Sequence, residues 1–206
     1  MALYKNLNKA FADKDLVTSL KLNIKTEALP EEISAFENLE SLYIQSKKLT
    51  FIPDWIKELK NLKTLYINST VLESINESIF KLENLKFLNL SGCRVQSLYI
   101  PITATKSLTD FNISKNLLKR FPQNIQALVN LENLNLASNE ITSIPQELVE
   151  LERLKRLTLD SNQLPLIPDY IQGFKSLNIF SIDNNPLSPE EKERVEQKFG
   201  ISFTPL

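Results

Sequence analysis

The sequence predicts an α/β solenoid, in which short coils stack in chain order and each contributes one parallel strand to a concave face. Three observations predict it. A leucine opens a new unit every 23 residues, at Leu39, Leu62, Leu85, Leu108, Leu131, Leu154 and Leu177. The spacing of apolar residues changes from two to three within each unit, and segments unlike the repeat stand at both ends. No such unit can bury its apolar stripe alone, so the coils are expected to stack.

The apolar positions within a unit predict a strand followed by a turn. In the clearest copy, positions 1, 4, 6, 11, 14, 18 and 21 are Leu131, Leu134, Leu136, Ile141, Ile144, Leu148 and Leu151. Positions 4 and 6 lie two apart, so both side chains leave the same face of a short strand. Positions 15 to 21, usually Pro-x-x-Ile-x-x-Leu, repeat every three residues, which suits a 3₁₀ or short helical segment on the convex face. Residues 17–187 are therefore expected to form seven units, the first one residue short, and a partial eighth.

The unit Leu-x-x-Leu-x-Leu-x-x-Asn-x-Leu-x-x-Ile-Pro-x-x-Leu-x-x-Leu resembles the 23-residue leucine-rich repeat of bacterial and intracellular eukaryotic proteins. The resemblance covers residues 17–187 and is closest to the bacterial type. It implies a horseshoe-shaped arc, and it implies a binding module, because members of this family mostly bind proteins. Several bacterial members are exported and meet host factors, so the resemblance also implies a host-interacting bacterial protein. Repetition of this kind indicates fold far more strongly than function.

Position 9 divides the repeats into two groups. The last four units carry Asn116, Asn139, Asn162 and Asn185, whereas the first four carry Lys25, Lys47, Thr70 and Cys93. In the family this asparagine lies inside the turn and bonds backbone groups that the turn leaves unpaired, a task that suits an amide. Lysine cannot fill the position in this way, so the turns near Lys25 and Lys47 are expected to differ, and the last four coils are expected to be the more regular. Cys93 is expected to be a buried substitute for asparagine rather than a nucleophile.

Two features of the predicted convex side depart from the pattern. In unit 85–107, the segment Tyr99–Thr105 replaces Pro-x-x-Ile-x-x-Leu and places Thr105 in an apolar position, so the coil is expected to bulge or loosen there. The segment is either a divergence of the repeat sequence without a function, between two more regular groups of repeats, or a loop that faces a partner. Trp55 takes position 17, where it either covers the neighbouring coil or forms an exposed anchor.

The two ends read as caps of one structural domain. Leu3, Leu7, Ala10 and Phe11 have helical spacing, which predicts an amphipathic capping helix within residues 1–16. Residues 188–206 are expected to form a second capping helix and a tail. Ser188 to Glu191 reads as a capping box with proline at the first helical position, and Gly200 ends the helix at 199.

Composition excludes several classes of function. Lys and Arg number 24 against 25 Asp and Glu, for a net charge of -1, which argues against nucleic-acid and polybasic membrane-surface binding. Histidine is absent and cysteine occurs once, so Ser-His or Cys-His catalysis and thiolate metal clusters are not expected. We therefore expect a monomeric, non-catalytic protein without metal or cofactor and without a membrane span. No signal peptide is visible, so the default compartment is the cytoplasm, unless a leader was trimmed from a secreted or cell-surface protein.

The residues between the core leucines, at positions 2, 3, 5, 7 and 8, are expected to point onto the concave face and form the binding surface. Asp160 and Asp183, adjacent at position 7, are expected to be solvated charge rather than a metal site. The candidate partner-binding residues are Tyr43, Tyr66, Asn89, Asn112 and Asn135 at position 5, with Phe87, Asp110, Asn133 and Arg156 at position 3. Exposed aromatic residues are typical of interface hot spots, although they also favour strands and stack on one another. The asparagines are suited to binding a peptide backbone or a glycan, and they are equally consistent with solvent-exposed polar residues that have no binding role.

Three functions follow from these observations. The leading hypothesis is a protein–protein interaction module that binds a partner on its concave face. The alternatives are a glycan-binding or surface-adhesion protein that uses the asparagine stripe, and a repeat fragment of a larger effector enzyme. The sequence itself does not identify the partner.

Overall fold

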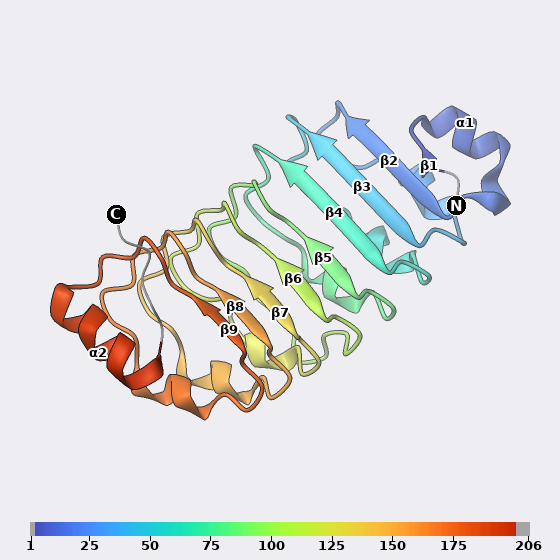
Figure 1. Cartoon of the computed structure of the whole chain (residues 1–206). Helices are drawn as coiled ribbons and strands as arrows, with labels where there is room; N and C mark the ends of the chain where they lie inside the picture. Colours follow the sequence, from blue (N-terminus) through green and yellow to red (C-terminus); the bar gives the residue numbers. More distant parts are fainter. Residues whose placement is uncertain (1–2, 201–206) are drawn as a thin grey trace.

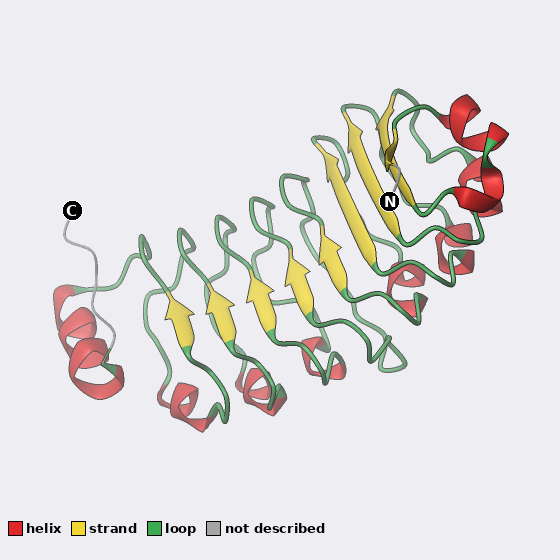
Figure 2. Cartoon of the chain, turned by 45° about the vertical axis from the view of Figure 1, so that its right-hand side comes forward, coloured by secondary structure: helices red, strands yellow, loops and turns green. Residues whose placement is uncertain are grey.

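The computed structural model describes residues 3–200, and its nine strands form one sheet in which β1 to β9 follow chain order. Every neighbouring pair is parallel, and the coils stack one after another along an elongated molecule (Figure 1). The strands form one long face, and short helices lie on the opposite side of the coils (Figure 2). This arrangement confirms the predicted α/β solenoid.

The strands differ in length along the array, and two α-helices stand at its ends. Helix α1 spans Leu7–Ala12 and helix α2 spans Pro189–Phe199. The strands are β1 Leu3–Tyr4, β2 Ser19–Ile24, β3 Ser41–Ser46, β4 Thr64–Ser69, β5 Phe87–Asn89, β6 Asp110–Asn112, β7 Asn133–Asn135, β8 Arg156–Thr158 and β9 Ile179–Ser181. The 3₁₀ helices are η1 Lys14–Leu16, η2 Glu31–Ala35, η3 Asp54–Glu58, η4 Glu77–Lys81, η5 Ile125–Ala127, η6 Gln146–Glu150 and η7 Asp169–Gly173. Within residues 3–200 no helix is long and apolar enough to cross a membrane.

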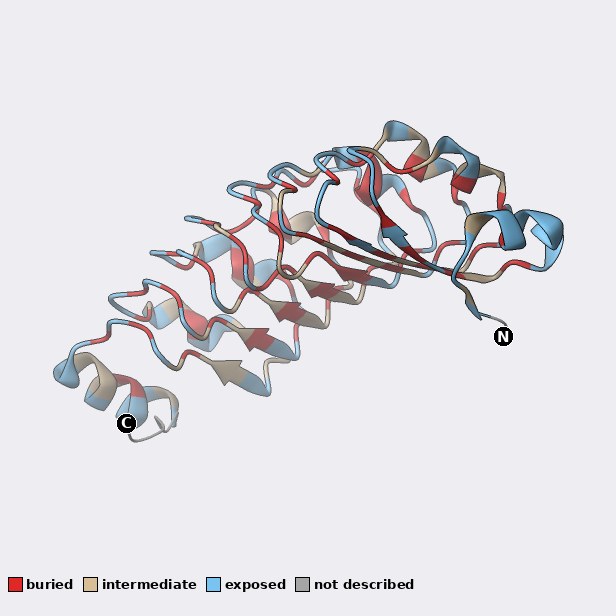
Figure 3. Ribbon diagram, turned by 90° about the horizontal axis from the view of Figure 1, so that it is seen from above, coloured by how far each residue is buried: buried red, intermediate tan, exposed pale blue. Residues whose placement is uncertain are grey.

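The core runs through the whole array rather than within single coils. The repeating apolar positions are buried coil after coil, so buried segments recur along the ribbon (Figure 3). Phe80 and Phe111 join adjacent parts of this core, with ring centroids 6.2 Å apart in an edge-on arrangement. Each buried aliphatic side chain contributes roughly 1.5–3 kcal/mol of gross stabilisation. Most of that gain offsets chain entropy, so the stack is stable only as an array.

The N-terminal end differs from the predicted single helix. Leu3 and Tyr4 form a strand that pairs with β2, and the α-helix is confined to Leu7–Ala12. The reason is that the first long strand has an open edge, whose unpaired N–H and C=O groups β1 partly satisfies. Ala10 is fully buried and Phe11 packs on Phe36 with ring centroids 5.1 Å apart, so this end still covers the core as expected.

The C-terminal helix forms where the sequence predicts it. The Ser188 hydroxyl accepts a hydrogen bond from the Glu191 N–H at 3.2 Å, and Gly200 takes the left-handed conformation that ends the helix. Glu191 does not complete a capping box; its carboxylate instead accepts from the Ile167 N–H at 2.7 Å in the last full coil. The helix is thereby tied to the array as well as capped.

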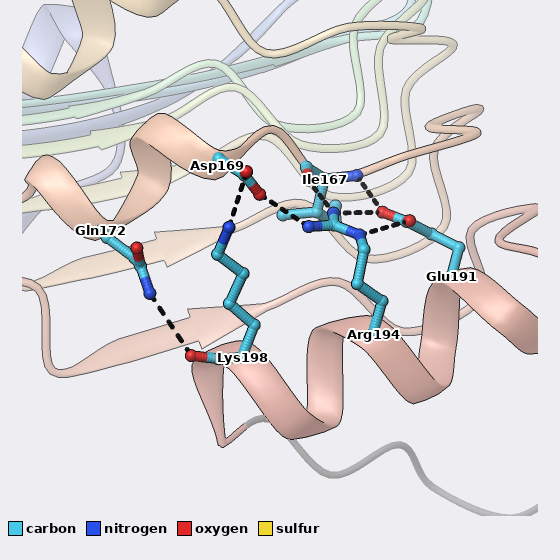
Figure 4. Close-up of polar contacts among 6 residues, drawn as sticks. All are labelled: Ile167, Asp169, Gln172, Glu191, Arg194 and Lys198. Atoms are coloured by element: carbon cyan, nitrogen blue, oxygen red, sulfur yellow. Dashed lines mark hydrogen bonds and ion pairs between the residues drawn. The ribbon is translucent and has the colours of Figure 1, made fainter.

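Charged side chains complete this attachment of α2 (Figure 4). The Arg194 guanidinium donates to Asp169 at 2.7 Å, to Glu191 at 2.7 Å and to the Ile167 carbonyl. The Lys198 ammonium lies 2.6 Å from Asp169 and, together with Arg194, lowers the pKa of that carboxyl. Arg194 likewise lowers the pKa of Glu191. These pairs join α2 to η7 and to the segment before it.

The convex side of unit 85–107 lacks the usual 3₁₀ helix, which confirms the predicted loosening. The side chains that fill its core differ from the register expected from the sequence. Ile100 is fully buried, whereas Ile102, which stands at position 18, is 80% exposed. Thr105 is buried, and its hydroxyl lies 3.2 Å from the Glu83 carbonyl and 2.7 Å from the Ser107 hydroxyl, so hydrogen bonds compensate for its polar group.

Trp55 lies in η3 and is half-buried against the hydrophobic core. Of the two interpretations of this residue, the structure favours the one in which its ring covers apolar side chains of the array. It is not a freely exposed anchor.

Candidate binding surface

Two kinds of turn follow the strands, and they decide which side chains reach the concave face. In β2, β3 and β4 the strand continues through position 8, and the side chain there, Ile24, Ser46 or Ser69, is buried. From β5 onward the strands end earlier, and position 8 is left-handed. The left-handed residues are Gly92, Lys115, Ser138, Ser161 and Asn184, with φ of 76°, 55°, 56°, 56° and 58°. The expectation that position 8 always faces the partner is therefore wrong for the first three coils.

The asparagines at position 9 are buried and join neighbouring coils, as the resemblance implies. Asn139 is representative: its Oδ1 accepts from the Leu118 N–H of the preceding coil at 3.1 Å. Its Nδ2 donates to the Ile113 carbonyl of the preceding coil at 3.1 Å and to the Leu136 carbonyl of its own coil at 2.9 Å. Asn116, Asn162 and Asn185 make the same bonds.

Serine at position 8 takes over this task in the first coils. The Ser46 hydroxyl donates to the Ile24 carbonyl at 2.8 Å and accepts from the Leu49 N–H at 2.9 Å. Lys25 and Lys47 are exposed, so the turns near them differ as expected. These coils are not irregular, however, because β2, β3 and β4 are the longest strands of the sheet. The hydroxyl satisfies the backbone one position earlier, and the strand can remain extended.

Cys93 stands at the junction of the two kinds of turn and behaves as a buried substitute for asparagine. Its Sγ accepts from the Ser69 N–H at 3.4 Å and lies 3.8 Å from the Ile67 carbonyl. Burial raises the pKa of the thiol, which lowers the thiolate fraction that a nucleophile requires. The structural interpretation of Cys93 is therefore confirmed.

A second ladder of polar side chains, which the sequence analysis missed, runs at position 23. These side chains donate to a carbonyl 22 to 24 residues earlier in the chain. The asparagine members are Asn38, Asn61, Asn84 and Asn130, at 2.9, 2.9, 2.9 and 2.7 Å, and the serine members are Ser107 and Ser176, at 2.7 and 2.8 Å. The recurrence of asparagine immediately before the first leucine of a unit was the signal that could have revealed it.

The predicted aromatic residues come together on the concave face of the long strands. Tyr43 is paired in register with Tyr66 on the adjacent strand, and their ring centroids lie 6.4 Å apart. Phe87 follows on β5 at a diagonal position, opposite Thr64, and is 38% exposed. We call Tyr43, Tyr66 and Phe87 the aromatic patch.

The three position-5 asparagines form a stripe beside the aromatic patch, and their amides are oriented by the backbone. Asn89, Asn112 and Asn135 each accept, through Oδ1, from the N–H two residues later, at 2.9, 3.0 and 3.0 Å. Their Nδ2 groups make no hydrogen bond to any other residue in 3–200. Asn89 is buried, so the structure does not place it on the exposed surface. Asn112 and Asn135 are half-buried and present donors rather than acceptors, on strands that lie about 4.8 Å apart.

The patch and the first member of the stripe share a surface without charge. At positions 3, 5 and 7 of β3, β4 and β5, all nine side chains are uncharged. They are Ser41, Tyr43, Gln45, Thr64, Tyr66, Asn68, Phe87, Asn89 and Ser91. Charges border them on both sides: the exposed Lys21 on β2 is paired in register with Tyr43, and Asp110 on β6 accepts from Asn133 Nδ2 at 2.7 Å and from the Thr109 hydroxyl at 2.7 Å. Arg156 lies farther along, on β8, so the structure does not bring it next to the aromatic patch.

The Asp160 carboxylate near the C-terminal end has a structural role. Asp160 Oδ1 accepts from the Ser181 hydroxyl at 2.6 Å and from the Asp183 N–H at 2.8 Å, which ties two coils together. Across residues 3–200, no three His, Cys, Asp or Glu side chains are grouped so that they could hold a metal ion.

This architecture is similar to that of two plant receptor structures. The ectodomain of the Arabidopsis thaliana receptor kinase GASSHO1/SCHENGEN3, in complex with CASPARIAN STRIP INTEGRITY FACTOR 2, is 29% identical with a TM-score of 0.68. The match covers 84% of this chain and 23% of that one. The plant peptide hormone receptor RGFR1, in complex with RGF2, is 25% identical with a TM-score of 0.66, and the match covers 89% and 30% of the two chains. This chain thus spans less than a third of either receptor structure.

A plant ice-binding protein shares the fold at 21% identity and a TM-score of 0.64, over 82% of this chain and 57% of that one. No curated protein matches in sequence. The family described as Leucine rich repeat matches residues 37–95 and 129–187, together more than half of the chain. The chain therefore belongs to the leucine-rich-repeat family.

Proposed function

We propose that this chain is a non-catalytic interaction module that binds a polypeptide segment of a partner protein along its concave face. The observation that carries the proposal is the uncharged surface of β3 to β5, in which the aromatic patch adjoins a stripe of amide donors. Tyr and Phe side chains supply large contact areas, and they are typical of the anchors that dominate binding energy. Two receptor ectodomains of similar structure are described in complex with ligands, one of them as a peptide hormone receptor, which supports a polypeptide as the ligand.

The orientation of the amide stripe indicates what the ligand offers in return. The Oδ1 atoms of Asn112 and Asn135 are engaged by the backbone, so their partly exposed Nδ2 groups favour a ligand rich in acceptors. The carbonyl groups of an extended polypeptide are such acceptors. The lack of charge at these strands favours an apolar or aromatic side chain on the aromatic patch, because an unpaired charge would lose solvation there.

The test is to isolate the partner with the full chain as bait and then to change the aromatic patch. The double variant Tyr43→Ala/Tyr66→Ala is expected to bind the recovered partner at least about tenfold more weakly. The matched control is Phe51→Ala, because Phe51 is also an exposed aromatic residue, 49% accessible, but lies outside the strands. Equal affinity of the double variant and the wild type would remove the aromatic patch from the proposal.

The resemblance to exported bacterial repeat proteins extends the proposal to a host protein as the partner. Parallel isolations from host and own-cell lysates test this extension: recovery from the host lysate alone supports it, and recovery from own-cell lysate alone contradicts it. The double variant serves as the negative bait in both.

The partly exposed donors of Asn112 and Asn135 also fit the hydroxyl oxygens of a glycan, which keeps surface adhesion as the second candidate. A glycan array distinguishes the two. Glycan binding that is lost in Asn112→Ala/Asn135→Ala but retained in Tyr43→Ala/Tyr66→Ala would favour adhesion over polypeptide binding.

A further inference from the structure

The convex side carries a hollow of about 760 Å³ that crosses three coils and lies apart from the concave face. We call it the flank groove. Its lining includes Tyr99, Arg120, Pro122, Asn124, Pro145 and Glu147. Because its residues follow the strands and precede or enter the 3₁₀ segments, the flank groove shares no residue with the aromatic patch or the asparagine stripe.

The groove results from the two coils that depart most from the repeat. Unit 85–107 has no 3₁₀ helix, and its chain instead runs inward with Ile100 and Pro101 buried. There it pairs with the next coil, through Ile100 N–H to the Gln123 carbonyl at 3.0 Å and Gln123 N–H to the Leu98 carbonyl at 2.8 Å. The next 3₁₀ helix, η5, has only three residues and follows Asn124, whose φ is 61°. The 3₁₀ helix on the convex side is therefore absent in unit 85–107 and shorter in the next unit than η3 or η6.

Lys119 and Arg120 supply two positive charges at this place. Both are exposed, and neither side chain forms an ion pair or hydrogen bond with any residue in 3–200. They occupy positions 12 and 13, which in the other complete 23-residue units hold no basic residue. Those pairs are Thr50 and Phe51, Glu73 and Ser74, Gln96 and Ser97, Thr142 and Ser143, and Pro165 and Leu166.

A second hollow, of about 620 Å³, is also lined by Lys119 and Arg120, together with Glu140, Thr142 and Gln163. Open space therefore adjoins the cations on two sides. Each hollow includes one carboxylate, Glu147 in the flank groove and Glu140 in the other, so the two cations outnumber the carboxylates in both. The excess positive charge favours a ligand with carboxylates.

Apolar surface stands next to the cations. Tyr99 lines the flank groove and is 47% exposed, and Ile102 follows in the same segment at 80% exposed. Pro122 and Pro145 line the groove as well. Three coils span about 10 Å at the usual strand spacing, which is the length of a few residues of extended chain.

We propose that the flank groove is a second docking site, for an acidic segment of a partner protein that carries an apolar side chain. Carboxylates of the segment bind Lys119 and Arg120, and the apolar side chain packs on Tyr99. The departure of residues 99–105 from the repeat thus forms one wall of a binding site. This site is independent of the concave face, so a partner can engage both faces of the array or each face can bind a different partner.

The probe is a short, capped, fluorescein-labelled peptide of glutamates around a central leucine, with its glutamine counterpart as the uncharged control. Fluorescence anisotropy with the full chain is expected to show binding of the acidic peptide only, weakened as salt rises. Lys119→Gln/Arg120→Gln is expected to weaken it about tenfold, and Tyr99→Ala about threefold. The matched control is Lys106→Gln/Arg153→Gln, which removes the same charge from exposed side chains of coils that border the groove.

Three outcomes would overturn the proposal. The first is equal weakening by both double variants, which would indicate general attraction of charge. The second is displacement of the peptide by inorganic phosphate at an equal concentration of charge, which would indicate a simple anion site. The third is a set of peptide-induced amide shifts in NMR spectra on β3 to β5 rather than on residues 96–99 and 119–126. Retention of binding by Tyr43→Ala/Tyr66→Ala keeps this test separate from that of the concave face.

Discussion

The first three coils and the last four complete the same repeat with different hydrogen bonds. In the coils of β2 to β4, an extended position 8 places a serine hydroxyl or an isoleucine in the core, and the strands run for six residues. In the coils of β6 to β9, position 8 is left-handed and an asparagine at position 9 bonds the backbone of its own coil and of the preceding coil. The difference shows that the apolar pattern determines how the coils stack, whereas one polar side chain in each turn determines where the strand ends.

This difference also shapes the binding surface. The longer strands hold positions 3, 5 and 7 in one continuous pleated face, which carries Tyr43 and Tyr66, and Phe87 adjoins them on the first short strand, β5. In the C-terminal coils the strand ends after position 5, and the concave side chains bond one another, as in Asp110 with Asn133 and Asp160 with Ser181. The first region is the better candidate for a partner because its polar groups are less engaged.

The largest effect is expected from removing a central asparagine of the ladder. Asn139→Ala leaves the buried Leu118 N–H without its acceptor, and it removes one of the two asparagine donors from each of the Ile113 and Leu136 carbonyls. We expect a loss of about 2–3 kcal/mol in the free energy of unfolding, measured by urea titration. An effect no larger than that of an exposed substitution such as Ser138→Ala would contradict the role of the ladder.

Removing the hydroxyl that replaces the ladder is expected to have a smaller effect. Ser46→Ala frees the Leu49 N–H and the Ile24 carbonyl, and we expect a loss of about 1–2 kcal/mol in urea titration. Thr70→Ala, an exposed position-9 substitution in the next coil, is the control. If Ser46→Ala were neutral, the long strands would not depend on this hydroxyl.

Substituting asparagine for Cys93, where the two kinds of turn meet, tests whether the conformation of position 8 determines which turn forms. Cys93→Asn places the amide after Gly92, which already has the left-handed conformation, so we expect a gain of about 0.5–1 kcal/mol in the same titration. Lys47→Asn places the amide after Ser46, which is extended, so we expect no gain in the free energy of unfolding. Equal responses of the two variants would mean that position 8 does not decide which turn forms.

The smallest effect is expected at the C-terminal cap, where charges rather than a strand join the end to the array. Asp169 and Glu191 have folded-state pKa values below their ordinary values of 3.8 and 4.5. Their contribution is therefore complete above about pH 5 and is lost as the pH falls below 4.5 and through the lowered values. The protection factors of the α2 amides, which correct for the pH dependence of intrinsic exchange, should fall in this window. Arg194→Gln should flatten the dependence, and an unchanged pH profile in this variant would contradict the assignment.

Much of the fold could be predicted because the repeat has a fixed period. The spacing of leucines defined the coils, and counting from them placed Tyr43 opposite Tyr66 in the correct register. The serine turns could not be predicted from position 9 alone, because Ser46 performs the same function from position 8. The inward path at Ile100 was missed because a strict period assigned Ile102 to the core, whereas burial depends on where the chain lies after the turn is lost.

The central proposal is that a polypeptide binds the concave face at β3, β4 and β5. Cross-saturation NMR on the isotope-labelled chain with its recovered partner tests this most directly. The expected result is the strongest attenuation at amides of β3, β4 and β5, including those of Tyr43, Tyr66 and Phe87. Attenuation confined to β8 and β9, or to the convex 3₁₀ segments, would contradict it.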